Sequence, residues 1–295
     1  MTKSIGWELY RSFLAVLAEG SLSGAARALG LTQPTVGRHV SALEAALGQA
    51  LFTRSQTGLL ATEAALSLSA YAEAMQRSAA ALERAAIGAG EGVSGTVRIS
   101  ASEVIAVHVL PPALARLRKA HPGLRLELVA TNRVQDLLQR EVDIAIRMTP
   151  PTQEALIARR VGDVALGLFA RDDYLAEHGT PQRLADLSRH ALIGFDAETP
   201  FLRAARQKFP AWAREAFSLR SDSDLAQWAL VQAGCGIGIG QAALAARDSR
   251  LVRVLASECT FALETWVTMH EDLRGSPRCK AVFDALVDWL RAYTG

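Results

Sequence analysis

The sequence predicts an α/β protein that begins with an all-α winged helix-turn-helix, continues into a long helix and ends in a larger α/β region. Three observations lead to this prediction. Two short amphipathic segments are separated by a turn at Gly30, a stretch from Thr62 to Ile87 is rich in alanine and lacks proline, and strand-like and helix-like runs alternate after Gly95. Since an ordinary domain has about 100–200 residues, a chain of 295 residues is expected to hold two or three units.

The first two helices are marked by their ends. From Trp7 to Glu19, apolar residues recur at helical spacing, and Gly20 can end this helix. Ser21 and Ser23 are candidates for the N-cap of a short second helix that runs through Leu29, because a serine hydroxyl can accept a hydrogen bond from a free N–H of the first turn.

A third helix follows the turn at Gly30. Thr32 can cap it, Pro34 is tolerated in its first turn, and Gly48 stops it. Two helices joined by a glycine-containing turn of a few residues are typical of a helix-turn-helix. The stretch from Leu51 to Thr62 has a glycine in mid-span and is expected to form a small hairpin, or wing. The face of the third helix that is expected to be buried consists of Val36, Val40, Leu43 and Leu47.

The alanine-rich segment that begins at Thr62 is expected to be one long helix that reaches about Ile87. Its apolar positions are spaced alternately by four and three residues, which is the pattern of a helix that pairs with another helix. The alternative is an isolated amphipathic helix on the surface. These positions are Ala61, Ala65, Leu68, Ala72, Met75, Ala79, Leu82 and Ala86.

Beyond the glycines between Gly88 and Gly95, strands and helices are expected to alternate. This order is typical of a mostly parallel sheet that is covered on both faces. Strands are expected at Val97–Ala101, Leu124–Ala130, Asp143–Met148, Val164–Ala170, Ala191–Phe195, Phe217–Arg220, Ile237–Ile239 and Thr265–His270. Helices are expected at Val104–Ala120, Val134–Arg140, Leu225–Ala233 and Pro277–Tyr293, the first of them delayed by Pro111 and Pro112.

Composition restricts the class of protein only weakly. The 32 basic residues nearly balance the 30 acidic ones, and the first 84 residues carry seven basic and six acidic side chains, so charge alone does not indicate a nucleic-acid-binding protein. No apolar run approaches the roughly 18–20 residues of a membrane span, and the first residues lack the apolar segment of a secretory signal. We therefore expect no contact with a membrane and a cytoplasmic location.

No motif for catalysis, a metal or a cofactor is found. The three cysteines lack metal-ligand spacing, and there is no G-x-S-x-G elbow, P-loop or H-E-x-x-H pair. The glycines from Gly234 to Gly240 run from a helix into a strand, the reverse of a dinucleotide-binding loop. We therefore predict no catalytic residue, no metal and no cofactor. An enzyme with an α/β domain fused to a helix-turn-helix and a simple solute-binding protein remain the alternatives.

The run from Phe13 to Ala65, FLAVLAEGSLSGAARALGLTQPTVGRHVSALEAALGQALFTRSQTGLLATEAA, contains AA-x-x-L-x-x-TQP, LE-x-x-LG and LF-x-R in that order. Further on stand GTVRIS, REVDIAIR and GCGIGIGQAAL. In these motifs nearly the whole chain resembles the LysR-type transcriptional regulators.

The resemblance implies three segments. Residues 1–61 are expected to form a winged helix-turn-helix, residues 62–92 a linker and dimerisation helix, and residues 93–295 an effector-binding domain. That domain is expected to have two α/β lobes, like a periplasmic solute-binding protein, with lobe one at 93–161 and 266–295 and lobe two at 162–265. The implied function is sequence-specific transcription regulation by a homodimer or homotetramer on double-stranded DNA. A small effector is expected between the lobes, and RNA polymerase is a further expected partner.

The expected DNA contacts lie off the buried stripe of the third helix. An arginine suits guanine and a glutamine suits adenine, whereas free N–H groups at a helix start favour phosphate. The alternative is an ordinary solvated helix face. At Gly37 the sequence departs from relatives, which usually carry serine there, and a glycine costs a helix about 1 kcal/mol relative to alanine. The candidate DNA-binding residues are Thr32, Gln33, Pro34, Thr35, Arg38 and, in the wing, Arg54.

Candidate effector-binding residues follow the carboxyl ends of the expected strands, where ligands bind in open α/β sheets. Hydroxyls and helix starts favour anions and Arg147 can pair with a carboxylate, so the sequence predicts a carboxylate or other anion as the effector. Alternatively, the hydroxyl groups are helix N-caps and the arginine forms a surface salt bridge. The candidates are Ser100, Ser102, Thr131, Arg147, Phe195, Phe201, Ser221 and Ser223.

Overall fold

The computed structural model describes residues 5–55, 58–87, 93–132, 142–151, 155–198, 202–203, 206 and 212–295. The chain folds as two compact units, which we describe separately. The N-terminal unit comprises residues 1–86, and the C-terminal unit comprises residues 87–138 and 142–295. Among the helices that the structure describes, none combines the length and the apolar character that a membrane crossing requires.

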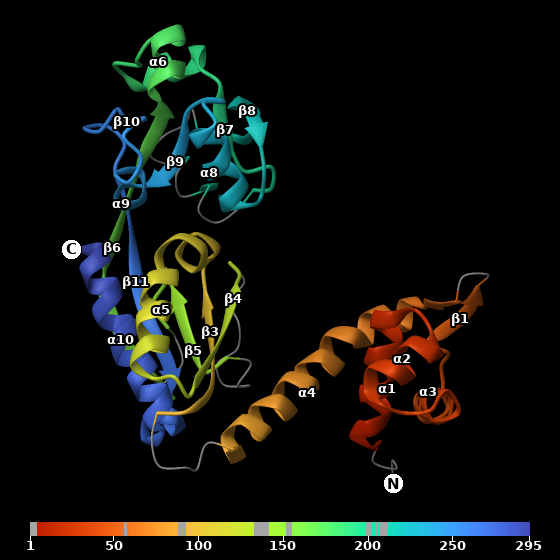
Figure 1. The fold of residues 1–295 in the computed structure, drawn as a ribbon. Coiled ribbons are helices and arrows are strands. Elements are labelled where there is room, and N and C mark those ends of the chain that lie inside the picture. The colour runs from red at the N-terminus through yellow and green to blue at the C-terminus, as the bar shows by residue number, and fades with distance from the viewer. Residues whose placement is uncertain are drawn as a thin grey trace. The chain divides into compact units, whose positions relative to one another are not determined.

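The N-terminal unit is a three-helix bundle with a hairpin and a long helix (Figure 1). The hairpin is antiparallel and pairs Phe52 with Ala61. The predicted helix-turn-helix, wing and long helix are therefore all present. The elements are α1 (Trp7–Glu19), α2 (Leu22–Leu29), α3 (Gln33–Leu47), β1 (Phe52–Ser55), β2 (Gly58–Ala61) and α4 (Glu63–Ile87).

The helix ends follow the predicted signals, with one exception. α1, α2 and α3 each end at a glycine in the left-handed conformation. Ser21 caps α2 by accepting a hydrogen bond from the N–H of Gly24 at 3.1 Å, whereas Ser23 lies inside that helix. Thr32 occupies the N-cap position of α3 but does not cap it, because its hydroxyl lies 2.9 Å from the Thr35 hydroxyl instead.

Two apolar clusters hold the N-terminal unit together. Phe13 of α1 is fully buried among Leu43, Leu51, Ala65 and Ala72, so this cluster joins α1, α3, the start of the wing and the first turns of α4. The second cluster joins α1, α2 and α3 through Val16, Ala25, Ala26, Val36 and Val40. The buried stripe of α3 is thus the one predicted, with Leu47 half-buried at its end.

The C-terminal unit contains two lobes built on one seven-stranded sheet and one two-stranded sheet. The large sheet has the order β10-β6-β11-β5-β3-β4, with β9 also paired to β6, and β7 pairs with β8. The strands are β3 (Gly95–Ala101), β4 (Leu124–Ala130), β5 (Ile144–Arg147), β6 (Leu156–Arg171), β7 (Leu192–Gly194), β8 (Phe217–Arg220), β9 (Gly238–Gln241), β10 (Leu251–Val254) and β11 (Phe261–His270). The helices are α5 (Pro111–Ala120), α6 (Asp172–His178), α8 (Asp224–Gln232), α9 (Ala242–Ala245) and α10 (Pro277–Thr294).

We call β3, β4, β5, α5 and α10 the first lobe, and α6, β7, β8, α8, β9, α9 and β10 the second lobe. The first lobe buries an apolar cluster around Ile99, Ile144 and Phe283, and the second lobe buries clusters around Leu168, Phe217 and Trp228. β6 and β11 run from one lobe into the other (Figure 1).

The sheet is mixed rather than mostly parallel. β3 pairs in parallel with β4 and β5, and β7 pairs in parallel with β8, but every pairing of β6 and β11 is antiparallel. The reason is that β6 carries the chain into the second lobe and β11 carries it back alongside. Both strands are longer than predicted, whereas α6, α9 and β10 were not predicted. The helix expected at Val134–Arg140 lies outside the described residues.

The β6–β11 ladder contains a bulge. Thr265 pairs with Gly162 and Trp266 pairs with Arg160, so Val161 has no pairing partner on β11. The Val161 carbonyl accepts a hydrogen bond from Thr294 Oγ1 at 2.8 Å, which attaches the end of α10 to this point. In the first lobe, a π-helical turn at Ile105–Val109 precedes α5, which begins at Pro111 as predicted from its prolines.

Candidate functional site

The start of α3 presents a polar surface. Gln33, Pro34 and Arg38 are exposed and Thr35 is half-buried, while Val36 and the rest of the buried stripe face the core. The Arg38 guanidinium lies 3.5 Å from the hydroxyl of Thr35, which in turn contacts that of Thr32. The structure therefore brings all five candidate residues of α3 together on one exposed surface.

Gly37 lies within this surface, and packing does not require a glycine there. A Cβ added to Gly37 would lie 3.7 Å from Leu22 Cδ1, an ordinary van der Waals distance. The Cβ of an alanine therefore fits at this position without a clash.

We expect Gly37→Ala to raise the free energy of unfolding of the N-terminal unit by about 0.5–1 kcal/mol, because alanine loses less backbone entropy in a helix. Denaturant unfolding of the two proteins measures this difference, with Ala42→Gly on the exposed face of α3 as the reverse control. A destabilised Gly37→Ala protein would mean that the glycine serves the packing of α3 after all.

The wing is attached to the three helices at two points. The N–H groups of Leu51 and Phe52 donate to Glu44 Oε1 at 2.7 and 3.2 Å. At the other strand, the Leu59 N–H donates to the Gly20 carbonyl at 2.8 Å. Arg54 is exposed on β1, so its side chain is presented to solvent by a hairpin that is fixed at both of its strands.

Two residues of α3 were missed by the sequence reasoning. Glu44 stands in the last turn of α3. The helix dipole disfavours a carboxylate at this end of a helix, so its presence in the sequence indicates that the side chain has another partner. His39 Nδ1 lies 2.8 Å from the hydroxyl of the buried residue Ser12. These contacts fix α3 relative to the wing and to α1.

In the C-terminal unit, several of the candidate effector residues make contacts within the scaffold. Arg147 donates to Ser100 Oγ at 2.6 Å and to the carbonyl of Ile146 at 2.8 Å, and burial lowers the pKa of its guanidinium. Ser223 accepts from the Ala226 N–H at 3.4 Å and so caps α8. The N-cap alternative therefore holds for this serine.

The other candidate hydroxyls have different environments. The Ser102 hydroxyl is buried and has no hydrogen-bond partner among the described residues. Ser221 Oγ accepts from the Ser223 N–H at 3.2 Å, and the backbone N–H of Thr131 donates to the Ala101 carbonyl at 2.9 Å. Phe201 lies outside the described residues.

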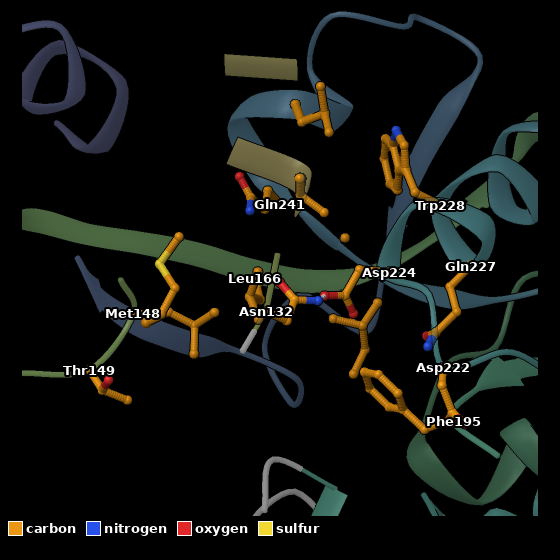
Figure 2. A pocket seen from close by; sticks show the side chains of 15 residues that line it. Asn132, Met148, Thr149, Leu166, Phe195, Asp222, Asp224, Gln227, Trp228 and Gln241 are labelled. Carbon is orange, nitrogen blue, oxygen red and sulfur yellow. Dashed lines mark hydrogen bonds between the residues drawn. The ribbon is translucent and has the colours of Figure 1, made fainter. Parts of the chain in front are cut away.

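A cavity of about 630 Å³ lies between the two lobes (Figure 2). Among the described candidate effector residues, only Phe195 lines this cavity. Thr131, Arg147 and Ser223 instead each stand next in sequence to a lining residue. The polar lining side chains are Asn132, Thr149, Asp222, Asp224, Gln227 and Gln241, and the larger apolar ones include Met148, Leu166, Trp228 and Leu263.

Four residues at the cavity link the lobes, and we call Glu103, Asn132, Ser223 and Asp224 the clasp. Asn132 Nδ2 donates to Asp224 Oδ2 at 2.7 Å, the contact drawn as a dashed line in Figure 2. Asn132 Oδ1 accepts from the Glu103 N–H at 3.1 Å, and Ser223 Oγ lies 3.4 Å from Glu103 Oε2. Burial raises the pKa of Asp224; the Asn132 hydrogen bond opposes this rise and the Glu103 charge adds to it.

The described residues offer no candidate metal centre, since no three histidine, cysteine, aspartate or glutamate side chains among them are arranged to hold an ion. The described lining of the cavity offers hydrogen-bonding groups, carboxylate charge and apolar contact.

Comparisons with known proteins identify both units. Residues 7–66 match the family model described as bacterial regulatory helix-turn-helix protein, lysR family, and residues 90–291 match the LysR substrate binding domain. The regulator CrgA of Neisseria meningitidis (strain 8013) is 32% identical over 183 residues, which are 62% of this chain and 61% of that protein. The activator AaeR of Escherichia coli (strain K12) is 30% identical over 183 residues, or 62% of this chain and 59% of that protein.

The match to these curated relatives thus spans about three fifths of their length. A solved structure of CrgA from Neisseria meningitidis covers 98% of this chain and 99% of its own, with a TM-score of 0.59 and 27% identity. The relatives are named as transcriptional regulators, in agreement with the prediction of a regulator rather than an enzyme. Because the two family models together match most of its length, the chain belongs to the LysR family of bacterial regulatory helix-turn-helix proteins.

Proposed function

We propose that the protein is a sequence-specific DNA-binding transcription regulator whose DNA binding is modulated by a small molecule in the cavity between the lobes. One observation carries the DNA-binding part of this proposal. The start of α3 exposes Gln33, Thr35 and Arg38 on a helix whose other face is fixed by buried Val36, Val40 and Leu43. A rigid helix with polar side chains on its outer face suits the major groove.

Each candidate residue has a distinct part in this proposal. Arg38 can form a bidentate contact with guanine and Gln33 with adenine, which would supply sequence specificity. Thr32 and Pro34 stand where the free N–H groups of α3 can receive a phosphate oxygen. Arg54, presented by the wing, supplies a second phosphate contact that fixes the orientation of the unit on DNA.

The proposed active form is a homodimer, with a tetramer as a further assembly. α4 exposes a row of large apolar side chains along its length, of which Tyr71 is 74% exposed. The others are Leu66, Met75 and Leu82. Met75 and Leu82 belong to the predicted seam, whereas Leu66 and Tyr71 lie beside it. A second copy of α4 would bury these side chains, and a dimer lets two copies of α3 reach two half-sites.

The effector proposal rests on the cavity and the clasp. A molecule between the lobes touches both, so it can change their relative angle if it binds one arrangement more tightly than another. The sequence predicts an anion, but Arg147 is engaged with Ser100 and Ile146, and the described lining includes the carboxylates of Asp222 and Asp224. These carboxylates favour a ligand without negative charge over the predicted anion.

The proposed setting follows from the DNA partner. A transcription regulator has to contact DNA and RNA polymerase, so we expect the protein in the cytoplasm. There, a change in how it binds DNA would alter the access of the polymerase to the DNA. The domain boundaries expected from the resemblance, residues 1–61, 62–92 and 93–295, remain our proposal for how these tasks are divided.

Footprinting on the DNA upstream of the protein's own gene tests the proposal. We expect a protected dyad, and we expect Arg38→Ala to weaken it by about 5- to 150-fold, which corresponds to about 1–3 kcal/mol for a bidentate base contact. Arg189→Ala removes an equal charge from an exposed position in the C-terminal unit and serves as the matched control. A footprint that is unchanged in Arg38→Ala, or absent in the unaltered protein, would contradict the proposal.

A further inference from the structure

We propose that the cavity between the lobes binds an organic amine, a molecule with an apolar body and one cationic nitrogen, and that Asp224 pairs with that nitrogen. This inference rests on the proposed function, in which the same cavity holds the effector. It adds the chemical class of the ligand and the residue that selects it.

Carboxylates concentrate at one part of the cavity. Asp222 and Asp224 both line it at the start of α8, and Glu103 lies beside them across the clasp. Asp222 Oδ1 accepts from the N–H groups of Asp196 and Ala197 at 3.1 and 2.8 Å, which fixes this side chain in place. No lysine, arginine or histidine is among the described lining residues. The local field therefore favours a cation.

Two buried amides in the lining also have unused hydrogen-bonding atoms. Gln227 is 6% exposed and Gln241 is 7% exposed. Gln227 Nε2 donates to the Ser221 carbonyl at 2.7 Å, and Gln241 Oε1 accepts from Tyr293 at 2.6 Å. Gln227 Oε1 and Gln241 Nε2 have no hydrogen-bond partner among the described residues. Neither atom is fully buried, so both remain open to a polar ligand in the cavity.

The rest of the cavity is apolar and shaped by an aromatic side chain. Trp228 is 3% exposed and packs edge-on against Phe169 at a centroid distance of 6.4 Å. Gly240 leaves room for this indole, because a Cβ there would lie 2.2 Å from the ring. Together with Leu166 and Phe195, the indole provides a wall for an alkyl or aryl group, and the volume of about 630 Å³ suits a small molecule.

The state of Asp224 explains why a cation is the favoured partner. Its pKa is raised by burial and by the negative charge of Glu103, so the carboxylate lacks full compensation in the protein. The contact that opposes this effect is the Asn132 amide, a neutral donor. An ammonium group supplies the missing opposite charge and a stronger, charge-assisted hydrogen bond.

The same contact connects the ligand to the lobes. Asp224 belongs to the second lobe and Asn132 to the first, so an amine that takes the Asp224 carboxylate competes with the clasp. A ligand that displaces Asn132 from Asp224 would favour lobe arrangements in which this contact is absent, and such a difference in affinity is what a ligand-driven shift requires.

Calorimetric titration of the full-length protein tests the inference with three amines and their carboxylate counterparts. The amines are benzylamine, 2-phenylethylamine and tryptamine; the carboxylates are phenylacetate, 3-phenylpropionate and indole-3-propionate. We expect at least one amine to bind about tenfold or more tightly than its counterpart, and Asp224→Asn to remove about that factor. Asp284→Asn makes the same change of charge at an exposed site on α10 and should leave the affinity unchanged.

Thermal melting separates lost binding from lost folding. Since the folded-state pKa of Asp224 is raised, its ionised form destabilises the folded unit at neutral pH. Asp224→Asn should therefore melt at the same or a higher temperature at neutral pH, and the difference should shrink as the pH falls and Asp224 becomes protonated.

Two outcomes overturn the inference in different ways. Tighter binding of the carboxylates, or an amine preference that survives Asp224→Asn, would remove the amine assignment but leave the cavity as the effector site. If no probe of either charge binds, the amine assignment fails together with the effector part of the proposed function. The DNA-binding part is tested separately by the footprint.

Discussion

Replacing Phe13 with alanine is expected to abolish specific DNA binding by removing about 3–5 kcal/mol from the stability of the N-terminal unit. Phe13 is fully buried, and its ring lies 5.7 Å from that of Phe52 in the wing. The same cluster includes Leu43 of α3 and Ala65 of α4. Loss of this ring leaves a cavity where all of these elements meet, and a domain is stable by only about 5–15 kcal/mol in total.

Hydrogen exchange measured on the full-length protein can localise this effect. We expect faster exchange in peptides from α1, α3 and β1 of Phe13→Ala, with the C-terminal unit unaffected, and loss of the footprint. Leu60→Ala deletes an exposed apolar side chain of the same unit and should change the stability by less than about 0.5 kcal/mol. A Phe13→Ala protein that keeps native exchange rates in α3 would show that this cluster does not hold the helix in place.

Gly236→Ala is the second substitution with a large expected effect, and it acts on the second lobe. Gly236 has a φ of 154°, which L-residues rarely adopt, and a Cβ there would lie 2.3 Å from the Ala191 carbonyl oxygen. That oxygen accepts a hydrogen bond from the Ile237 N–H at 2.9 Å, and the bond is part of the bridge between β7 and the residues before β9. Backbone strain of about 1–3 kcal/mol and a comparable overpacking cost therefore add.

Two other glycines of this unit allow the effect of backbone strain to be separated from the effect of the steric clash. Gly179 has a φ of 84° and open space around its Cα, so Gly179→Ala introduces strain without a clash. Gly275 has neither constraint, so Gly275→Ala should be nearly neutral. Thermal unfolding of the full-length proteins is expected to rank Gly236→Ala as the least stable, followed by Gly179→Ala and Gly275→Ala. Equal melting temperatures for all three would contradict the contact with Ala191.

The helices of the N-terminal unit could be predicted because their ends and buried faces are encoded locally. Glycines stand where three helices end, Ser21 stands where α2 begins, and the apolar spacing of α3 marks its buried stripe. What could not be predicted is how the elements are tied together. The contacts of Glu44 with the wing and of His39 with Ser12 join residues that are distant in sequence, and no local pattern reports them.

The candidate effector-binding residues lie close in sequence to the residues that line the cavity, but among the described candidates only Phe195 lines it. Thr131, Arg147 and Ser223, at the ends of β4 and β5 and the start of α8, do not line the cavity, whereas their sequence neighbours Asn132, Met148 and Asp224 do. Successive side chains of an extended chain point to opposite sides, so an error of one residue exchanges a lining residue for a scaffold residue. Only the pairing of the strands decides which side faces the cavity.

The lengths of β6 and β11 were underestimated for a related reason. Gly162 interrupts the apolar pattern of β6 and reads as the end of a strand, whereas the strand continues through it by way of the bulge at Val161. A strand is predicted from the regular alternation of apolar and polar residues. A bulge shifts this alternation by one residue, so the strand beyond the bulge no longer fits the pattern.

That bulge also determines how the two lobes can move. β6 and β11 are hydrogen-bonded to each other on both sides of Val161, so neither can slide without the other. The ladder is interrupted, and its twist increased, at one point only. We therefore expect any rotation of one lobe against the other to be concentrated at this interruption of the paired strands. Since Thr294 at the end of α10 holds the Val161 carbonyl, any such rotation must load the last turn of that helix.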